Sequence, residues 1–373
     1  MQTFCPNKEV CGSCSWSHIP YEKQLQQKLS DINGTFALKG VDLEVNEIVP
    51  SPVTEHYRNR MDFVIDFEGR VGMRQKGKWW KVIDDHTCFL SDERIEALFH
   101  VIRDWATSSG LSYFDRKAHT GLLRYAVIRS TTLGQTMVNI VTSVPEDESD
   151  IRASLAKLSE NKDISTLIWS QNSTISDVSF GDVLETIAGP GFIEEVINGS
   201  NFRISPNAFF QTNPHAASSL LDTVQEFCGD LSDKTLLDLY CGSGFFSIAL
   251  SATAGKTIGV EMVPEAIADA RTNAKINNAN VEFHDAKTEN FDWMTFGADV
   301  VILDPPRSGM HDSALADVIG AKPQTIVYVS CSPKNFAREM IQLQNHYNVE
   351  AMRAIDMFPH TPHVELVTKL VRK

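Results

Sequence analysis

Apolar residues in the first half of the chain follow helical and strand periods in turn. Residues 21–32 place Tyr21, Leu25, Leu29 and Ile32 on one helical face, with Pro20 before the segment and Gly34 after it. This spacing predicts a helix that ends at Gly34. From about residue 44 to residue 83, short alternating segments indicate strands. Their predicted turns are the glycines at Gly69, Gly72 and Gly77.

The rest of this half repeats the mixture of helix and strand. We expect a helix over about residues 91–109, a hairpin formed by residues 123–130 and 136–142, and a helix that ends near residue 160. Strands are expected near residues 166–170 and 192–204. The N-terminal part is therefore predicted to be an α+β domain.

The pattern changes near Pro206, after which strands and helices alternate. The predicted strands cover residues 235–239, 257–261, 281–284, 298–304 and 325–330, and the helices residues 214–229, 245–252 and 264–277. Such alternation is typical of a doubly wound α/β domain with a parallel sheet. Two antiparallel strands are expected at the end, over residues 349–356 and 365–371. We therefore predict one domain over residues 1–206 and another over residues 207–373.

Composition narrows the class of protein. Of the 373 residues, 42% are hydrophobic and 22% are charged, as in soluble globular proteins. No apolar run reaches the roughly 18 residues of a membrane span, and the N-terminus lacks the basic and apolar start of a secretory signal. These features predict a cytoplasmic protein without a membrane partner.

The charge pattern restricts how the chain can bind nucleic acid. A formal net charge of −14 argues against RNA binding over the whole surface, but a local basic patch remains possible. One such patch runs from Arg58 to Lys81 and is interrupted by Trp79 and Trp80. It is either part of an RNA-binding surface or the solvated face of a hairpin.

A glycine turn follows the first strand of the α/β domain. The run Asp238-Leu239-Tyr240-Cys241-Gly242-Ser243-Gly244 lets the backbone approach a ligand, and Glu261 ends the next strand 23 positions after Asp238. An acidic residue at that spacing accepts hydrogen bonds from ribose hydroxyls, so the pair indicates a nucleoside-containing cofactor. NAD is disfavoured because the third glycine of its fingerprint is missing.

Two later strands end in residues with useful chemistry. Asp304-Pro305-Pro306-Arg307 follows the fourth strand, and Cys331 follows the fifth, at the edge where such folds bind ligands. A reachable cysteine with a lowered pKa is a nucleophile, although most single cysteines at strand ends are only buried packing residues. Glu365, among apolar and histidine neighbours, is either a general base with a raised pKa or an ordinary strand carboxylate.

These motifs together resemble the RNA 5-methyluridine methyltransferase family. The resemblance rests on the glycine turn from Asp238, the Asp304-Pro-Pro-Arg run, Ser330-Cys331-Ser-Pro, His363-Val-Glu365, and Phe209-Phe210-Gln211-Thr212-Asn213. It covers essentially the whole chain. It implies an S-adenosylmethionine-dependent (Rossmann-like) catalytic domain and an N-terminal RNA-binding domain. It also implies S-adenosylmethionine at Gln211, Tyr240, Glu261 and Asp304, with Cys331 as nucleophile and Glu365 as base.

The chemistry follows from the weak nucleophilicity of uracil C5. Addition of the Cys331 thiolate to C6 makes C5 nucleophilic, C5 takes the methyl group, Glu365 removes the C5 proton, and the thiolate leaves. The base must leave its stack to reach such a site, and Phe209 or Phe210 is a candidate to support it, unless both are core residues. Asp285 is a positional candidate for an adenine contact.

Four further cysteines form a possible metal-ligand set, Cys5, Cys11, Cys14 and Cys88. Their spacing lacks the two paired units that zinc prefers, whereas four thiolates fit a [4Fe–4S] cluster. The ribosomal RNA branch of the family carries such a cluster, so the resemblance implies an iron–sulfur site with a structural or RNA-positioning role.

Other functions remain open at this stage. The cysteine spacing does not fit a radical enzyme, Arg307 stands where an amino-methylating enzyme has an aromatic residue, and a non-catalytic iron–sulfur RNA-binding protein would leave Cys331 and Glu365 idle. A cluster without an extra N-terminal barrel resembles the smaller 23S ribosomal RNA branch. We therefore expect 23S ribosomal RNA as substrate, with a transfer RNA T-loop uridine as the alternative.

Overall fold

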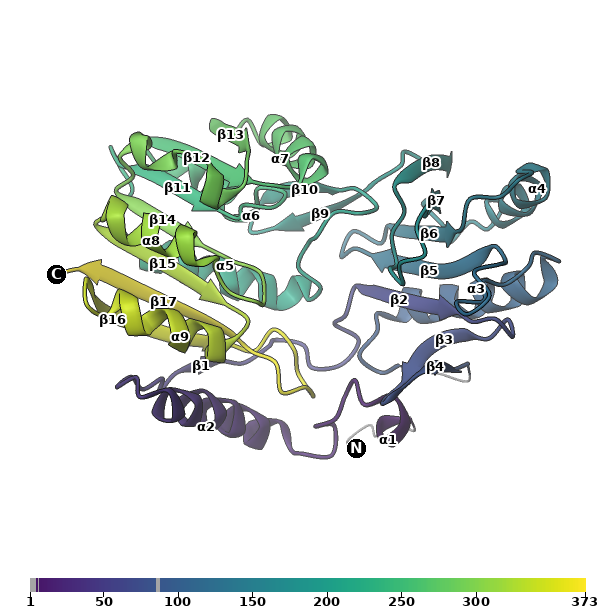
Figure 1. Cartoon of the computed structure of the whole chain (residues 1–373), viewed down its shortest axis with the longest axis horizontal. Coiled ribbons are helices and arrows are strands. Elements are labelled where there is room, and N and C mark those ends of the chain that lie inside the picture. Colours follow the sequence, from purple (N-terminus) through teal and green to yellow (C-terminus); the bar gives the residue numbers. More distant parts are fainter. Residues whose placement is uncertain (1–4, 6, 85–87) are drawn as a thin grey trace. The chain divides into compact units, whose positions relative to one another are not determined.

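The chain forms two compact units. The computed structural model describes residues 5, 7–84 and 88–373 (Figure 1). One unit combines the described residues up to His18 with Thr54–Glu195 and Arg203–Asn207, and the other combines Ile19–Val53, Val196–Phe202 and Ala208–Lys373. Each unit is described below by itself.

The unit that contains the C-terminal part is built on an eight-stranded sheet within the described residues, in the order β1-β16-β17-β15-β14-β11-β12-β13. Its strands are β1 (Ile48–Val49), β11 (Thr235–Leu239), β12 (Lys256–Glu261), β13 (Val281–Asp285), β14 (Val300–Leu303), β15 (Thr325–Ser330), β16 (Tyr347–Ile355) and β17 (Glu365–Arg372). Its helices are α2 (Tyr21–Lys39), α5 (Pro214–Cys228), α6 (Phe245–Leu250), α7 (Pro264–Ile276), α8 (Asp312–Ala321) and α9 (Pro333–Leu343). Short 3-10 turns cover Ser251–Thr253, Thr288–Asn290 and Trp293–Phe296.

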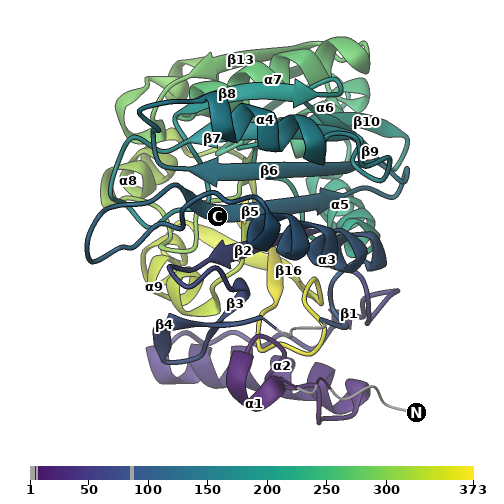
Figure 2. The same cartoon turned by 90° about the vertical axis from the view of Figure 1, so that its right-hand side faces the viewer.

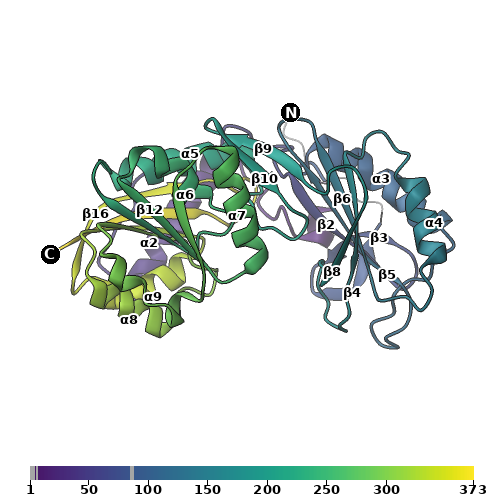
Figure 3. The ribbon, with the colours of Figure 1, turned by 90° about the horizontal axis from the view of Figure 1, so that it is seen from above.

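The sheet has the doubly wound arrangement that the sequence predicted. Strands β11 to β15 are mutually parallel, whereas β17 pairs antiparallel with both β15 and β16. Helices α5, α6 and α7 lie on one face, and α2, α8 and α9 on the other (Figure 3). The apolar core under α2, α8 and α9 includes Ile32, Phe36, Leu315 and Phe336, all 2% exposed or less. Because the strands are parallel, the carboxyl ends of β11, β12, β14 and β15 lie along one edge.

Helix α2 is longer than the sequence indicated. It continues through Gly34, where a Cβ would meet no neighbour, and ends at Gly40, whose φ of 68° is left-handed. The buried face that includes Ile32 also includes Phe36, whose ring lies 5.9 Å from that of Phe336 in α9. Packing therefore offsets the low helix propensity of one interior glycine.

The other unit is built on a mostly antiparallel sheet in the order β4-β3-β2-β5-β6-β7-β8. Its strands are β2 (Arg60–Ile65), β3 (Val71–Gln75), β4 (Lys78–Ile83), β5 (Leu123–Ser130), β6 (Thr136–Thr142), β7 (Thr166–Gln171) and β8 (Val183–Ala188). Helices α3 (Glu93–Ser108) and α4 (Ser149–Leu158) cover one face (Figure 2), and α1 (Lys8–Cys11) is a single turn. A separate hairpin pairs β9 (Ile193–Ile197) with β10 (Ser200–Ile204).

The compact units do not divide the chain at one position. Residues 19–53 pack with the C-terminal part because α2 covers its sheet, although they precede the α+β region in sequence. A division between residues 1–206 and 207–373 remains a prediction about folding or function. Among the described residues, no helix is long and apolar enough to cross a membrane.

Candidate active site

The polar residues expected to act together lie at the carboxyl edge of the parallel strands. Tyr240 directly follows β11, Glu261 ends β12, Asp304 follows β14 and Cys331 follows β15. Glu365 begins the antiparallel strand β17 at the same edge. The parallel order of the sheet therefore gathers residues that are far apart in sequence.

The turn after β11 forms a backbone cradle closed by Glu261. Gly242 N–H donates to Glu261 Oε2 (3.2 Å), while Met262 and Val263 N–H donate to Oε1 (2.8 and 2.9 Å). Gly244 has a φ of 85°, and a Cβ there would lie 2.6 Å from Ile248. A Cβ on Gly242 would meet nothing within 4 Å. This open space beside a fixed carboxylate suits the ribose of a nucleoside.

The floor of the site is acidic. Asp238 is fully buried, and Ser247 N–H donates to its Oδ2 (3.0 Å). Burial and the nearby Asp304 and Glu261 raise the pKa of Asp238 to about 8, and burial raises the pKa of Asp304 to about 7. A bound cation such as a sulfonium would favour the ionised carboxylates, so the acidic floor fits S-adenosylmethionine.

Cys331 directly follows β15, and Glu365 begins the neighbouring antiparallel strand β17. Ser330 pairs with Leu366, so the next position along the register sets Cys331 against Glu365. Cys331 is half-buried and Glu365 is buried. Burial, together with Glu365 and Asp304, raises the pKa of the Cys331 thiol to about 11, and burial with Asp304 raises the pKa of Glu365 well above its usual value. A thiol beside a proton-accepting carboxyl can perform addition and elimination at a ring carbon.

Arg307 is a site residue that the sequence identified only as part of a motif. Its guanidinium lowers the pKa of both Cys331 and Glu365, opposing burial. Arg307 Nη2 lies 3.4 Å from His363 Nδ1, and Asn335 Nδ2 donates to the Arg307 carbonyl (2.6 Å). Its position directly after Asp304-Pro-Pro was the available signal.

A buried glutamate fixes the loop that carries Arg307. Glu339 Oε1 accepts from Met310 N–H (3.0 Å), and its Oε2 accepts from the Tyr328 hydroxyl (2.5 Å). A Cβ on Gly309 would lie 2.2 Å from Glu339 Oε1, so only glycine fits where the loop passes this carboxylate. Sequence reasoning did not identify Glu339 as the residue that supports this loop.

In the Phe209-Phe210-Gln211 segment, one aromatic ring is buried and the other is exposed. Phe210 is 3% exposed and packs with Phe202 and Phe245, whereas Phe209 is 69% exposed. Gln211 is half-buried, and Asp285 ends β13 paired with Glu261. Phe210 is therefore a core residue, and of the two rings only that of Phe209 is exposed.

Comparisons with known proteins identify the family of the chain. A sequence model described as tRNA (Uracil-5-)-methyltransferase matches residues 192–373. The tRNA (uracil(54)-C(5))-methyltransferase of Pyrococcus horikoshii is 39% identical over 97% of this chain and 84% of its own length. The chain belongs to the tRNA (uracil-5-)-methyltransferase family. The enzyme is thus an S-adenosylmethionine-dependent RNA (uracil-C5)-methyltransferase, as the sequence predicted.

Two further relatives extend over most of the chain. The crystal structure of the Pyrococcus abyssi tRNA (uracil-54, C5)-methyltransferase in complex with S-adenosyl-L-homocysteine matches with a TM-score of 0.81 and 35% identity, covering 96% of this chain and 86% of that one. An uncharacterized RNA methyltransferase of Caldanaerobacter subterraneus is 35% identical over 98% of this chain and 84% of its own length. The similarity therefore includes both units, and the predicted fold class is confirmed.

The four cysteines predicted to hold an iron–sulfur cluster, all of which the structure describes, are not arranged as a metal site. Among the described residues, no three or more His, Cys, Asp or Glu side chains are arranged to hold a metal ion, so the iron–sulfur site at Cys5, Cys11, Cys14 and Cys88 is not supported. The thiols instead make local contacts. A hydrogen bond with Cys14 lowers the pKa of Cys5 to about 6, and Cys11 Sγ lies 3.1 Å from Ser13 Oγ.

The same four thiols are nevertheless buried near one another. All four are buried, and electrostatic interactions link Cys14 with Cys88 and Cys88 with Cys11. Burial raises the pKa of Cys88 to about 11. Thiols gathered in this way are a suitable donor set for a soft metal centre if the ligands move together.

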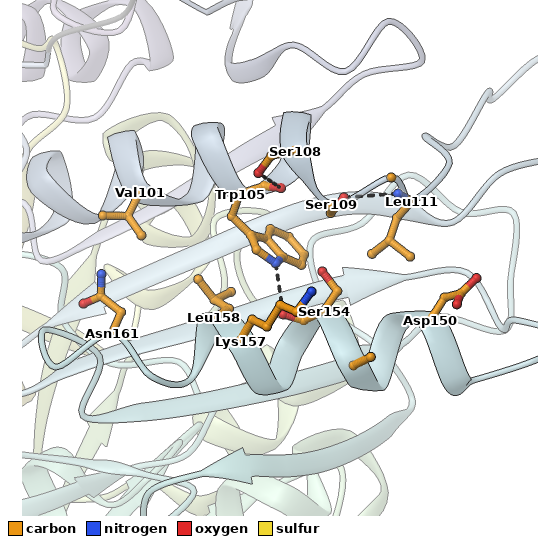
Figure 4. Close-up of a pocket in the computed structure, with 12 residues that line it drawn as sticks. Val101, Trp105, Ser108, Ser109, Leu111, Asp150, Ser154, Lys157, Leu158 and Asn161 are labelled. Carbon is orange, nitrogen blue, oxygen red and sulfur yellow. Dashed lines mark hydrogen bonds between the residues drawn. The ribbon is translucent and has the colours of Figure 1, made fainter.

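A separate hollow in the other unit holds none of the predicted site residues. It measures about 660 Å³ and lies between α3 and α4, where Trp105 Nε1 donates to the Ser154 carbonyl (3.3 Å) (Figure 4). Leu111, Asp150 and Lys157 complete its rim.

Proposed function

We propose that the enzyme methylates C5 of a uridine in the T-loop of transfer RNA. The supporting observation is the 39% identity over 97% of the chain to the Pyrococcus horikoshii enzyme, whose name specifies transfer RNA uracil 54. Two more Pyrococcus relatives carry the same name. These names favour transfer RNA over the 23S ribosomal RNA that the sequence first suggested.

In the proposed mechanism, the Cys331 thiolate adds to C6 of the flipped uracil and forms a sulfur–carbon bond. S-Adenosylmethionine would supply an electrophilic methyl group; as C5 takes it, the sulfonium–methyl bond would break and leave S-adenosylhomocysteine. Glu365 then takes the C5 proton, and the C6–sulfur bond breaks as the C5–C6 double bond returns and Cys331 leaves as thiolate. The proposed steps regenerate the Cys331 thiolate and leave the former C5 proton on Glu365.

The thiol must first lose its proton. Because its pKa is about 11 in the protein without ligands, little thiolate exists at neutral pH. Arg307 opposes this rise, and the positive charge of the bound methyl donor acts in the same direction. We therefore propose that cofactor binding activates Cys331, with Gln211, Tyr240, Glu261 and Asp304 holding the cofactor or the base.

The test compares labelled methyl transfer from S-adenosylmethionine to unmodified transfer RNA and to 23S ribosomal RNA, followed by nucleoside analysis. We expect 5-methyluridine in transfer RNA, located in the T-loop, and none with Cys331→Ala. Methylation of 23S ribosomal RNA alone would reject the proposed substrate but keep the chemistry. No transfer to either RNA would reject the function.

We also propose that Cys5, Cys11, Cys14 and Cys88 hold a [4Fe–4S] cluster. The support is their burial and mutual proximity, and their soft sulfur donors. The cluster would tie the N-terminal segment to the segment before α3. Iron and acid-labile sulfide should accompany anaerobically prepared protein at about four each per chain. Their absence would reject this proposal, and the methyl-transfer proposal would be unaffected.

A further inference from the structure

Two adjacent tryptophans are exposed on an edge strand of the α+β unit. Trp79 and Trp80 in β4 are 54% and 53% exposed, and their rings lie 5.8 Å apart at an interplanar angle of 88°. Burying such large side chains would be favourable by more than 1 kcal/mol each in order of magnitude, so their exposure requires a reason. We call residues 71–83, which form β3 and β4, the tryptophan hairpin (Figure 2).

The tryptophan hairpin is held in place by a polar network. Arg74 Nη1 donates to the Trp79 carbonyl (2.6 Å), and the Arg116 guanidinium lies 5.9 Å from the centre of the Trp79 ring. Both arginines form ion pairs with Asp177. Arg74 therefore holds the backbone of Trp79 and Arg116 lies beside its ring, while more than half of the Trp79 surface stays exposed.

Three exposed lysines flank the two tryptophans in the sequence of the hairpin. Lys76, Lys78 and Lys81 are exposed, and none of them forms an ion pair with another residue in the described part of the chain. The chain as a whole has a formal net charge of −14, so this patch differs in sign from the average surface. Exposed aromatic rings flanked by cations match the chemistry of unpaired bases and their phosphates.

The cysteine segment supports the turn of the hairpin. Lys76 N–H donates to the Val10 carbonyl (2.8 Å), and a Cβ on Gly12 would lie 2.6 Å from Lys76 Cδ. Gly12 lies between Cys11 and Cys14, so the loop that carries these two thiols contacts the turn before the tryptophans. Only glycine, with a φ of 75°, allows this approach.

We propose that the tryptophan hairpin is a stacking platform for unpaired bases of the RNA substrate, with Lys76, Lys78 and Lys81 contacting the adjoining phosphates. This inference rests on the proposed function, because it assumes an RNA substrate. It adds a second RNA contact, distinct from the residues at the strand ends that carry the chemistry. The platform contributes affinity and not the chemical step.

The experiment measures the dissociation constant of an unmodified transfer RNA transcript and the kcat at saturating RNA. For Trp79→Ala/Trp80→Ala we expect affinity to fall by about 5- to 150-fold for each base that stacks, with kcat unchanged. Trp79→Phe/Trp80→Phe should retain most of the affinity because a phenyl ring also stacks. The matched control is Phe67→Ala, which removes an aromatic side chain that is 51% exposed in a neighbouring turn.

The salt dependence provides a second readout. Lys78→Gln/Lys81→Gln should reduce the slope of log affinity against log salt by about 1 to 2, because each lysine that contacts a phosphate contributes about 0.7 to 0.9. Wild-type affinity in the folded double-alanine variant would overturn the platform, and so would a phenylalanine variant as weak as the alanine variant. A wild-type enzyme that binds transfer RNA without methylating it would overturn the proposed function and leave the platform standing.

Discussion

Arg307 is a cation that acts electrostatically on both Cys331 and Glu365, the two residues that gain or lose a proton in the proposed reaction. It lowers the pKa of Cys331 and of Glu365. Arg307→Gln should therefore raise both pKa values, so that the thiolate forms only at higher pH. At neutral pH the rate of methyl transfer should fall about tenfold for each unit by which the thiol pKa rises. The rising limb of the pH–rate profile should move to higher pH.

The matched control is Lys334→Gln, which removes one exposed positive charge three positions after Cys331. Lys334 is not among the main causes of the Cys331 shift, so its profile should follow the wild type. An Arg307→Gln enzyme that is slower at every pH without a displaced limb would show that Arg307 binds the substrate and does not tune the thiol.

Cys331 differs from the other cysteines in accessibility. It is half-buried, while the other six are buried. Apart from the proposed cluster ligands, which include Cys5 with its lowered pKa, a neutral alkylating reagent should therefore modify Cys331 before Cys228 and Cys241. The reaction should be slow at pH 7 and accelerate as pH approaches about 11, since the thiolate is the reactive form. S-Adenosylmethionine should accelerate it at pH 7 more than uncharged S-adenosylhomocysteine. Peptide mass spectrometry over time measures both effects, and equal rates with the two ligands would contradict activation by the cofactor's charge.

At the residue scale, the sequence predicted Cys331 at the shared edge because strand ends in a parallel sheet meet there. Glu365, which begins an antiparallel strand, was instead predicted from its apolar and histidine neighbours. Sequence reasoning did not assign a charge-tuning role to Arg307, since an electrostatic effect depends on how two loops approach each other. It also left Phe209 and Phe210 equivalent. Only the packing of Phe210 against Phe202 and Phe245 separates the core ring from the exposed one.

Among the elements, the turn between β11 and α6 combines backbone freedom with open space. Gly242 and Gly199 both have positive φ, and a Cβ on either would meet nothing within 4 Å. Gly242→Ala and Gly199→Ala should thus cost similar stability, about 1 to 2 kcal/mol. Only Gly242→Ala should weaken S-adenosylhomocysteine binding, because its methyl group enters the cradle beside Glu261. Calorimetric titration of both variants measures this difference, and equal affinities would place the cofactor elsewhere.

Helix α2 is joined to the segment before β17 by a buried ion pair. Lys28 Nζ donates to Asp356 Oδ1 (2.6 Å) and to the Phe358 carbonyl (3.0 Å), and both charged side chains are fully buried. Lys28→Met leaves the Asp356 carboxylate buried without its partner, so it should lower the free energy of unfolding by about 3 to 5 kcal/mol. Urea unfolding measures this loss.

A surface pair supplies the comparison for that substitution. Lys369→Met breaks the partly exposed pair with Glu350 and should cost less than about 1 kcal/mol. Adding Asp356→Asn to Lys28→Met should recover part of the loss, because no buried charge then remains. If the double variant is less stable than Lys28→Met, the cost comes from lost packing and not from the unpaired carboxylate.

Helices and strands were predicted correctly where the apolar residues followed a single period along the segment. Predictions failed where contacts with other elements determined the local structure. The strands at Thr235–Leu239 and Thr325–Ser330 have the predicted bounds. Gly72 was read as a turn but lies within β3, where a Cβ would lie 1.9 Å from the Ile83 carbonyl, so this glycine allows two strands to approach. Helices α8 and α9 were not predicted, although both bury apolar residues at helical spacing, Leu315 and Val318 in α8 and Phe336 and Met340 in α9.

For the molecule as a whole, each compact unit combines segments that are separated in the sequence. Residues 19–53 lie far from the C-terminal part in sequence but pack on its sheet, and periodicity alone contains no signal for such a long-range contact. The change in pattern near residue 206 was visible because crossovers between parallel strands need helices. Where a segment packs depends on complementary surfaces, which a linear pattern does not encode.

The assignment of α2 to the same unit as the C-terminal part has a measurable consequence. S-Adenosylhomocysteine at about 100 times its dissociation constant should stabilise the unit that binds it by about 2.7 kcal/mol. The ligand contacts proposed at Tyr240, Glu261 and Asp304 all belong to the unit that contains α2. In hydrogen exchange, protection should therefore rise in Tyr21–Lys39 together with residues 208–373. The amides of Thr54–Glu195 should change less.

In Gly242→Ala, at the same ligand concentration, protection should rise little in either region. If Tyr21–Lys39 instead exchanged like Thr54–Glu195, α2 would unfold with the α+β part, and the division after residue 206 would describe the cooperative units better than spatial packing does.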